Sequence, residues 1–204
     1  MSAPPRPMRC YSTRLRLTSV AAISLFIASA LPAMADGEFF QGDYASGASS
    51  VVGSIVRGPV GASIGWSEFD DGKALSANFT YGLSVPALGD GATFRFGPTA
   101  RLDQDDNLDL GAKVVFERWA PTDWGSVFVL ADYNTILNEY LLLGELTHAN
   151  SGLSGSLAIQ GGDNGFRENT FILGYAIPQT PFGLRLGYRV NARQAVIGFT
   201  INTF

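Results

Sequence analysis

Cysteine and histidine are almost absent from this sequence of 204 residues, which contains one of each, Cys10 and His148. A single cysteine cannot form an intramolecular disulfide, and Cys10 lies in a leader that we expect to be removed. Disulfide frameworks and thiolate metal sites are therefore excluded from the mature chain. A single histidine also leaves few candidates for a catalytic base or a metal ligand, so we predict no cofactor, no metal site and no enzymatic activity.

The sequence also lacks an apolar run of the roughly 20 residues that a transmembrane helix requires. The short run VAAISLFIASAL follows a segment with four arginines and no acidic residue, and it precedes PAMA. This order is typical of a secretory signal peptide with small residues at its cleavage site. We predict that residues 1–35 are cleaved and that residues 36–204 form one domain, an uncleaved amphipathic anchor being the alternative.

Basic residues are scarce after the predicted cleavage site. All 18 acidic residues remain, but four of the 14 basic residues leave with the leader, which gives a formal net charge of −8. Proteins that bind nucleic acid usually carry the opposite charge. We therefore predict no nucleic-acid partner.

The body of the chain shows alternation of apolar and polar residues, and little helical periodicity. In ALSANFTYGLSV, for example, Leu75, Phe79 and Tyr81 fall on one face, and Ser76 and Asn78 fall on the other. The sequence predicts strands at 60–67, 74–85, 92–102, 108–118, 125–134, 139–148, 153–160, 169–177, 184–190 and 194–203, and weaker ones at 38–46 and 48–57.

Two architectures produce such strands. A soluble secreted or periplasmic β-barrel turns its apolar face inward, where it can bind an apolar ligand. A membrane barrel turns that face toward lipid and keeps polar and charged residues inside. Strands of about ten residues, aromatic residues near strand ends and full charges in mid-strand favour the membrane barrel. We predict an all-β, closed, antiparallel up-and-down transmembrane barrel.

The turns support this topology because they alternate in character along the chain. Every second connection is hydrophilic and mostly acidic, as in FDDGK and DQDDN, whereas the others are marked by Pro or Gly, as in PALGDG and PQTPFG. A chain that crosses a membrane repeatedly sorts its turns in this way. Counting the weak strand at 38–46 gives about twelve strands, an even number as in bacterial barrels, with eight or ten longer strands as alternatives.

The chain ends in AVIGFTINTF, with the aromatic Phe204 as its last residue. This ending resembles that of bacterial outer-membrane barrels, whose final strand ends in Phe and serves as a recognition signal for the barrel assembly machinery. The resemblance implies an outer-membrane location, contact with outer-membrane lipids and an assembly role for Phe204. Ile197, Phe199 and Ile201 lie in the opposite phase to Phe204, so we expect a bulge or an early strand end near Asn202.

A narrower resemblance covers residues 111–140. This stretch is similar to the cellulose-biosynthesis protein BcsS family of small outer-membrane barrels. The likeness is carried by Gly111, Lys113, Glu117, Trp119, Tyr133, Thr135 and Tyr140. It implies a link to exopolysaccharide biosynthesis or export.

Charged residues recur on the polar faces of the predicted strands, which point into the lumen of a membrane barrel. We expect Arg101 to lie opposite Asp109, Arg95 to reach Glu117 on the diagonal, and Lys113 to lie between Asp109 and Glu117. The predicted lumenal charge network is Arg95, Arg101, Asp109, Lys113, Glu117, Asp132, Glu145, Arg185 and Arg189. Such a network can fill and stabilise the barrel, or it can form a charged constriction that selects solutes.

Two further motifs have ordinary explanations. THANSG faintly resembles the His-x-Ser motif of lipid A 3-O-deacylases, but residue 150 is Asn, and we expect Ser151 to face away from His148 or to lie in the turn. The acidic stretch DQDDN lacks the glycine and the distant glutamate of a calcium loop, so we expect a solvated turn.

These observations together predict a non-enzymatic outer-membrane barrel with a structural, accessory or narrow-pore role. Its expected partners are lipids, the assembly machinery, and small solutes or polysaccharide. The two alternatives are a soluble barrel that binds an apolar ligand and, more remotely, a lipid A deacylase-like enzyme.

Overall fold

The computed structural model describes residues 36–69 and 72–204. The signal peptide predicted for residues 1–35 lies outside the described residues and stays a prediction. No helix in the described ranges is long and apolar enough to cross a membrane. The elements of these ranges are β1 (Gly37–Ala45), β2 (Ala48–Arg57), β3 (Val60–Phe69), β4 (Gly72–Ser84), η2 (Pro86–Leu88), β5 (Ala92–Asp103), β6 (Leu108–Thr122), β7 (Gly125–Asn134), η3 (Ile136–Asn138), β8 (Glu139–His148), β9 (Leu153–Gly161), β10 (Arg167–Ala176), β11 (Phe182–Arg189) and β12 (Gln194–Asn202).

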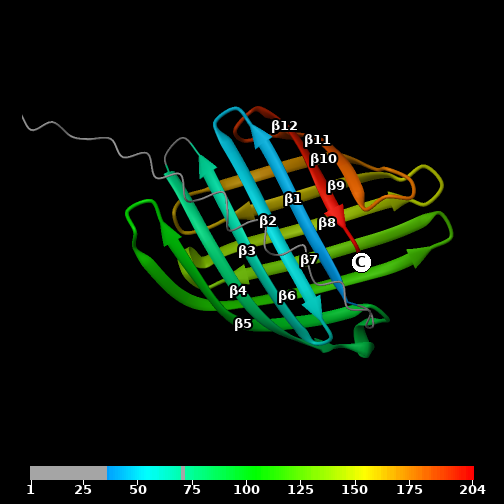
Figure 1. Ribbon diagram of the computed structural model, residues 1–204, viewed down its shortest axis with the longest axis horizontal. Helices are drawn as coiled ribbons and strands as arrows, with labels where there is room; N and C mark the ends of the chain where they lie inside the picture. Colours follow the sequence, from blue (N-terminus) through cyan, green and yellow to red (C-terminus); the bar gives the residue numbers. More distant parts are fainter. Residues whose placement is uncertain (1–35, 70–71) are drawn as a thin grey trace, which may run out of the picture. The chain divides into compact units, whose positions relative to one another are not determined.

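Pairing between β1 and β12 closes the sheet into a barrel (Figure 1). Each strand pairs with the strand that follows it in the chain, and Phe40 opposite Ile201 belongs to the closing seam. Closure removes the free edges that an open sheet would expose. The structure confirms the all-β, antiparallel up-and-down barrel with twelve strands. The weak pattern at 38–46 corresponds to β1, and the alternatives of eight or ten strands are wrong.

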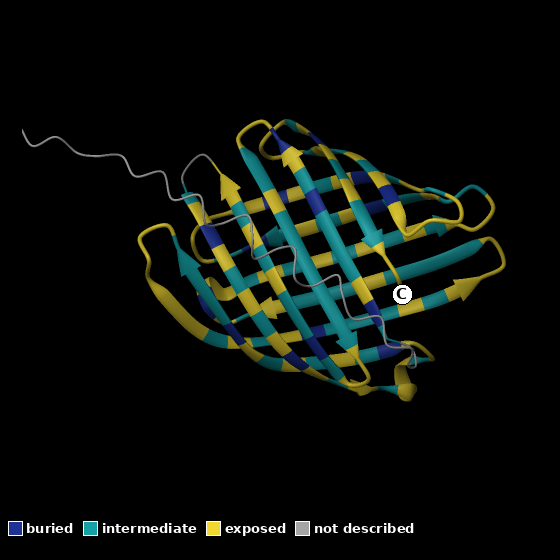
Figure 2. Cartoon of the chain, viewed as in Figure 1, coloured by how far each residue is buried: buried dark blue, intermediate teal, exposed yellow. Residues whose placement is uncertain are grey.

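Successive residues of a strand point alternately out of the barrel and into it, and strands such as β4 show this as banding in Figure 2. In β4, the outward Phe79 is 54% exposed, whereas the inward Ala74 and Thr80 are each 8% exposed. The same inward and outward phase passes from strand to strand, since Asn78 lies opposite both Ser63 and Thr99. The period-2 pattern of the sequence therefore gives each strand two chemically different faces.

The outward face is apolar around most of the barrel. Large apolar side chains are exposed on every strand from β3 to β12, and Leu110 and Leu173 are 75% and 68% exposed. A soluble barrel that binds an apolar ligand would turn these side chains inward. The observed orientation is that of a barrel that faces lipid.

The connections between strands form two rims. We call the connections 46–47, 104–107, 135–138, 162–166 and 190–193 the acidic rim, and 58–59, 85–91, 123–124, 149–152 and 177–181 the proline rim. An up-and-down chain returns to the same rim after every second connection, so the hydrophilic and the Pro- or Gly-marked turns separate as predicted. Both Asp36 and Phe204 lie at the proline rim.

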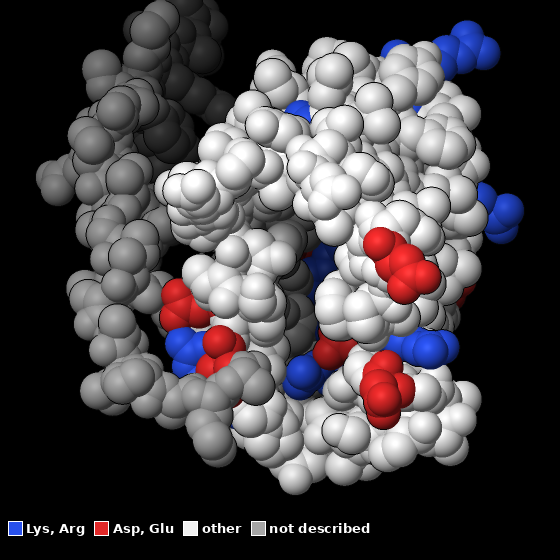
Figure 3. Space-filling view, turned by 90° about the vertical axis from the view of Figure 1, so that its right-hand side faces the viewer, with Lys and Arg blue, Asp and Glu red and all other residues white. Residues whose placement is uncertain are grey.

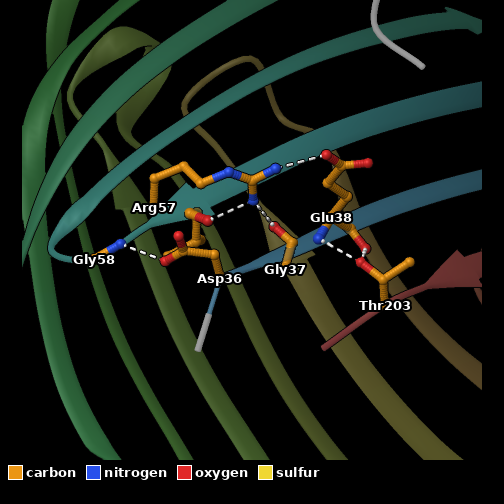
Figure 4. A network of polar contacts seen from close by, with 7 residues as sticks. Asp36, Gly37, Glu38, Arg57, Gly58 and Thr203 are labelled. Atoms are coloured by element: carbon orange, nitrogen blue, oxygen red, sulfur yellow. Dashed lines mark hydrogen bonds and ion pairs between the residues drawn. The ribbon is translucent and has the colours of Figure 1, made fainter. Parts of the chain in front are cut away.

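Polar contacts join the first and last strands at the proline rim (Figure 4). The backbone N–H of Thr203 donates to the Glu38 carbonyl oxygen at 3.0 Å, and the N–H of Glu38 donates to Thr203 Oγ1 at 2.9 Å. Arg57 Nη2 lies 2.7 Å from Glu38 Oε1, and the N–H of Gly58 donates to Asp36 Oδ1 at 2.6 Å. These contacts fix the strands where the barrel closes.

The terminal aromatic side chain has a defined place next to this seam. β12 ends at Asn202, in agreement with the early strand end predicted from the phase of Ile201 and Phe204. The ring of Phe204 covers Gly37, where an added Cβ would lie 2.2 Å from Phe204 Cδ1. Gly37 therefore gives the ring the space that it occupies. The role of Phe204 as a signal for the assembly machinery stays a prediction.

Candidate functional site

One part of the inner face, which we call the hydroxyl wall, consists of the inward residues of β2, β3 and β4. It carries no charged side chain and is lined by Ser50, Ser54, Ser63, Ser67, Ser76, Asn78 and Thr80 together with small or apolar residues. Asn78 Nδ2 donates to Ser63 Oγ at 3.0 Å, and Thr99 Oγ1 of β5 donates to Asn78 Oδ1 at 2.7 Å. Short neutral side chains thus satisfy one another along this wall.

The rest of the inner face, from β5 around to β1, carries the charges, and we call it the charged arc. Five ion pairs lie on this arc. They are Arg95–Glu117 (2.6 Å), Lys113–Asp132 (2.6 Å), Arg185–Asp43 (3.0 Å), Arg189–Glu168 (3.5 Å) and Arg101–Glu139. In the part of the chain that the structure describes, no ion pair joins strands from opposite sides of the barrel, so the pairs lie along the wall.

Glycines on the inner face provide room for these charged groups against the backbone. A Cβ on Gly82 would lie 2.9 Å from Arg95 Nη1, and a Cβ on Gly198 would lie 2.0 Å from Asp43 Oδ1. Asp43 therefore extends over β12 to Arg185 on β11, where its two oxygens accept hydrogen bonds of 3.0 and 3.3 Å. Arg95 and Asp43 lie close against the wall because the residues beneath them are glycines.

Two partners differ from those predicted from the sequence. Arg101 is in register with Asp109, as expected, but its guanidinium pairs with Glu139 of β8. Lys113 pairs with Asp132 of β7 rather than with acidic residues of its own strand. Residues four apart on one strand are separated by roughly 13 Å, so Lys113 is closer to Asp132 on the neighbouring strand than to Asp109 or Glu117.

The predicted network lacked three acidic residues that complete the ion pairs, namely Asp43, Glu139 and Glu168. Glu168 is the most enclosed of them, at 2% exposure. Its carboxylate accepts the backbone N–H groups of Asn191 and Ala192 at 2.8 and 3.0 Å and pairs with Arg189. It thereby holds the β11–β12 turn of the acidic rim in place.

Glu145 of β8 is also on the charged arc, but its surroundings differ. No basic side chain in residues 36–69 and 72–204 lies within ion-pair distance of its carboxylate. Its one side-chain hydrogen bond is a long one, from Thr147 Oγ1 at 3.4 Å. Its cross-strand neighbour on β7 is Phe128.

The barrel opens to the outside at one of its ends. Viewed from the right-hand side of Figure 1, the space-filling surface is hollowed near its centre, and basic and acidic side chains are visible within the hollow (Figure 3). Charged groups are therefore accessible from this side.

His148 and Ser151 are closer together than the sequence suggested. Ser151 lies in the β8–β9 turn, as one of the two expectations had it, and its Oγ is 2.9 Å from His148 Nδ1. The same oxygen accepts the backbone N–H of Leu153 at 3.2 Å, which is the contact of a Ser-stabilised turn. Among the described residues no carboxylate forms an ion pair with His148, so the pair has no acidic third member.

The acidic β5–β6 turn is organised by its own hydrogen bonds. Asp103 Oδ1 accepts the N–H groups of Asp105 and Asn107 at 2.8 and 2.9 Å, and Asn107 Nδ2 donates to Asp103 Oδ2. The hydrogen bonds from Asn107 hold the pKa of the exposed Asp103 below its ordinary value. The described residues contain no group of three or more His, Cys, Asp or Glu arranged to hold a metal ion.

The residues of the 111–140 resemblance come together in the structure. Gly111 lies beneath Thr135, whose Oγ1 accepts the N–H of Ala112 at 2.9 Å. Tyr133 and Tyr140 are cross-strand partners on the outer face of β7 and β8. Lys113 and Glu117 each belong to an ion pair. The spacing of these residues therefore has a structural basis in one hairpin and the adjacent strand.

Comparisons with known proteins identify the fold. No protein family and no curated protein match the sequence. The KdgM porin is similar in structure, with a TM-score of 0.54 and 13% identity over 82% of this chain and 99% of that chain. The KdgM porin in complex with disordered oligogalacturonate has a TM-score of 0.55 and 13% identity over the same shares of the two chains. Omp33 of Acinetobacter baumannii has a TM-score of 0.52 and 12% identity over 82% of this chain and 96% of that chain.

Proposed function

We propose that this chain is a non-enzymatic outer-membrane barrel whose lumen admits small hydrophilic solutes. The observation that carries the proposal is that four of the five ion pairs join strands no more than two apart along the wall, and that two of them, Arg95–Glu117 and Arg185–Asp43, lie against glycines. The apolar outer face, the predicted signal peptide and the barrel fold shared with porins support an outer-membrane location. A twelve-stranded barrel is also wider than the eight-stranded barrels that side chains just fill.

The charges of the inner face favour cationic and neutral solutes over anionic ones. Five basic residues face eight acidic ones on it. They are Arg95, Arg101, Lys113, Arg185 and Arg189 against Asp43, Asp103, Asp109, Glu117, Asp132, Glu139, Glu145 and Glu168. Such an excess of acidic groups raises the local concentration of cations and repels polyanions. A polyanion such as the oligogalacturonate bound to the KdgM porin is therefore a poor match for this lumen.

Swelling of proteoliposomes tests the proposal. Vesicles that contain the purified barrel should swell in isotonic solutions of a small neutral sugar and of a small amino sugar, and more slowly in the corresponding uronic acid. Swelling equal to that of protein-free vesicles, with a barrel whose electrophoretic mobility shifts on boiling, would contradict a pore. A faster rate for the uronic acid would contradict the cation preference.

A second candidate function is an accessory role in exopolysaccharide biosynthesis or export. It is favoured by the resemblance of residues 111–140 to the BcsS family and by the way Gly111, Thr135 and Lys113 assemble in one region. Deletion of the gene in its native host should then lower secreted cellulose, and the wild-type gene should restore it. Unchanged cellulose would leave the pore as the function to pursue.

A further inference from the structure

Glu145 is a carboxylate in the middle of a strand of the charged arc that forms no ion pair among the described residues. The other inward carboxylates of the strands, except Asp103 and Asp109 near the acidic rim, have a basic partner at 3.5 Å or less. Arg185 of β11 is on the same inner face, three strands away from Glu145. Arg185, however, gives two hydrogen bonds to Asp43. The negative charge of Glu145 is thus left without a partner of its own.

Several side chains next to Glu145 are apolar, while the neighbouring polar groups are the hydroxyls of Thr147 and Ser156. Phe128 lies directly across on β7, Leu143 shares the inner face of β8, and Leu130 lies opposite Leu143. On the other side, Ser156 is the neighbour on β9, and Ile172 of β10 lies beyond it. A half-buried carboxylate among hydrocarbon groups is poorly solvated, and a cation placed beside it offsets that cost.

We propose that Glu145 and the side chains of Phe128, Leu130 and Leu143 form a lumenal binding site for organic ammonium ions that carry an apolar group. The carboxylate attracts the ammonium group, and the aromatic ring and leucines contact the hydrocarbon part. A phenyl ring also attracts a cation placed over its face. The site rests on the proposed function, since the ligand reaches it through the lumen.

The surroundings disfavour a metal ion as the ligand. Calcium and magnesium need several oxygen ligands, and Phe128, Leu130 and Leu143 supply none. Among the residues that the structure describes, no three acidic, histidine or cysteine side chains gather as a metal site. An ammonium ion with an apolar substituent matches both the single carboxylate and the hydrocarbon around it.

Asp109 provides the matched control, because it also lacks an ion pair within the described residues and lies on the inner face of β6. It differs from Glu145 in that it is exposed near the acidic rim, opposite Arg101. Asp109→Asn and Glu145→Gln change the lumenal charge equally. A ligand drawn only by net charge would respond to both variants in the same way.

The experiment combines conductance in planar bilayers with calorimetric titration of the barrel in a non-ionic detergent, and phenethylammonium is the probe. Folding of each variant is checked by its mobility shift on boiling. We expect the wild type to be blocked in a concentration-dependent way, Glu145→Gln to need at least tenfold more probe, and Asp109→Asn to need less than twofold more. Phe128→Ser should weaken the binding of phenethylammonium more than the binding of ammonium itself.

The outcomes separate this site from the proposed pore. Conductance that phenethylammonium does not block would overturn the site and leave the pore intact. An equal loss of affinity for phenethylammonium in Glu145→Gln and Asp109→Asn would do the same. Absence of conductance would overturn the pore, and the titration would then decide the site on its own. If the wild type releases or absorbs heat on binding phenethylammonium and Glu145→Gln does not, the titration supports the site. If the wild type gives no more heat than empty micelles, the titration refutes the site.

Discussion

The hydroxyl wall and the charged arc line the same lumen by different means. On β2–β4, short neutral side chains such as Ser63 and Asn78 bond to one another and leave the backbone lightly covered. On the arc, long side chains such as Arg95 and Arg185 carry full charges that acidic partners compensate. Both parts have the same alternation along their strands and the same apolar outer face.

The comparison teaches that the inner face of one barrel can be lined with or without charge, provided that polar groups find partners along the wall. A charge on the arc is stabilised by a partner one to three strands away, over a glycine in the cases of Arg95 and Asp43. The hydroxyl wall needs no such arrangement because its groups are neutral. The predictions below test how far the two parts differ.

The largest expected effect comes from removing a partner in the most enclosed ion pair of the arc. Glu168→Ala leaves Arg189 and the N–H groups of Asn191 and Ala192 without their acceptor. Loss of one partner of a buried pair costs about 3–5 kcal/mol. We expect that decrease in the free energy of unfolding, measured by urea titration of the barrel in lipid vesicles.

The control is Glu38→Ala, which removes a carboxylate from the exposed Arg57–Glu38 pair at the proline rim, where the two side chains are 43% and 48% exposed. Exposed ion pairs contribute about 1 kcal/mol or less, so this variant should unfold close to the wild type. An equal decrease in the free energy of unfolding in the two variants would contradict the special role assigned to Glu168.

The next largest effect is on membrane assembly, and it compares the outer and inner faces of β4, a strand of the hydroxyl wall. Phe79→Arg places a charge on the outer face of β4, whereas Ser76→Arg places it inside. A charge near the bilayer midplane costs roughly 2–4 kcal/mol, while a lumenal charge remains hydrated. We expect Phe79→Arg to reduce assembled barrel in membrane fractions and Ser76→Arg to assemble normally. The reverse result would place Phe79 in the interior.

A smaller effect is expected from the hydrogen bonds of the hydroxyl wall. Asn78→Ala removes bonds to Ser63 and Thr99. Each such bond contributes about 1 kcal/mol, so the free energy of unfolding should fall by about 1–2 kcal/mol. Ion selectivity should not change, because no charge is lost. A shift in selectivity comparable with that of a charge variant would contradict the neutral role of this wall.

The sequence predicts much of this barrel because the signals are local. Alternation defines the strands and their faces, and turn residues define where the strands end. It does not predict the partners of the charges, since Arg101 reaches over two strands to Glu139 and Asp43 over one to Arg185. These contacts depend on side-chain paths and on glycines beneath them. The isolation of Glu145 follows only once those partners are known.

The smallest effect concerns a charge at the end of the charged arc, next to the acidic rim. Asp103 has a lowered pKa, so its hydrogen bonds stabilise the folded state above the ordinary value of 3.8. That contribution is lost as the pH falls through the lowered pKa of the folded state. We expect Asp103→Ala to be slightly less stable than the wild type near neutral pH, with the difference vanishing on acidification. A difference that grows in acid would contradict this.

The reversal potential of single channels in a tenfold gradient of potassium chloride tests the central claim most directly. The account predicts discrete conductance steps and a reversal potential whose sign shows preference for potassium, because unpaired acidic charge faces an open lumen. Glu145→Gln should move that potential toward zero, and Asn78→Ala should leave it unchanged. A folded barrel that does not conduct, or one that prefers chloride, would contradict the account.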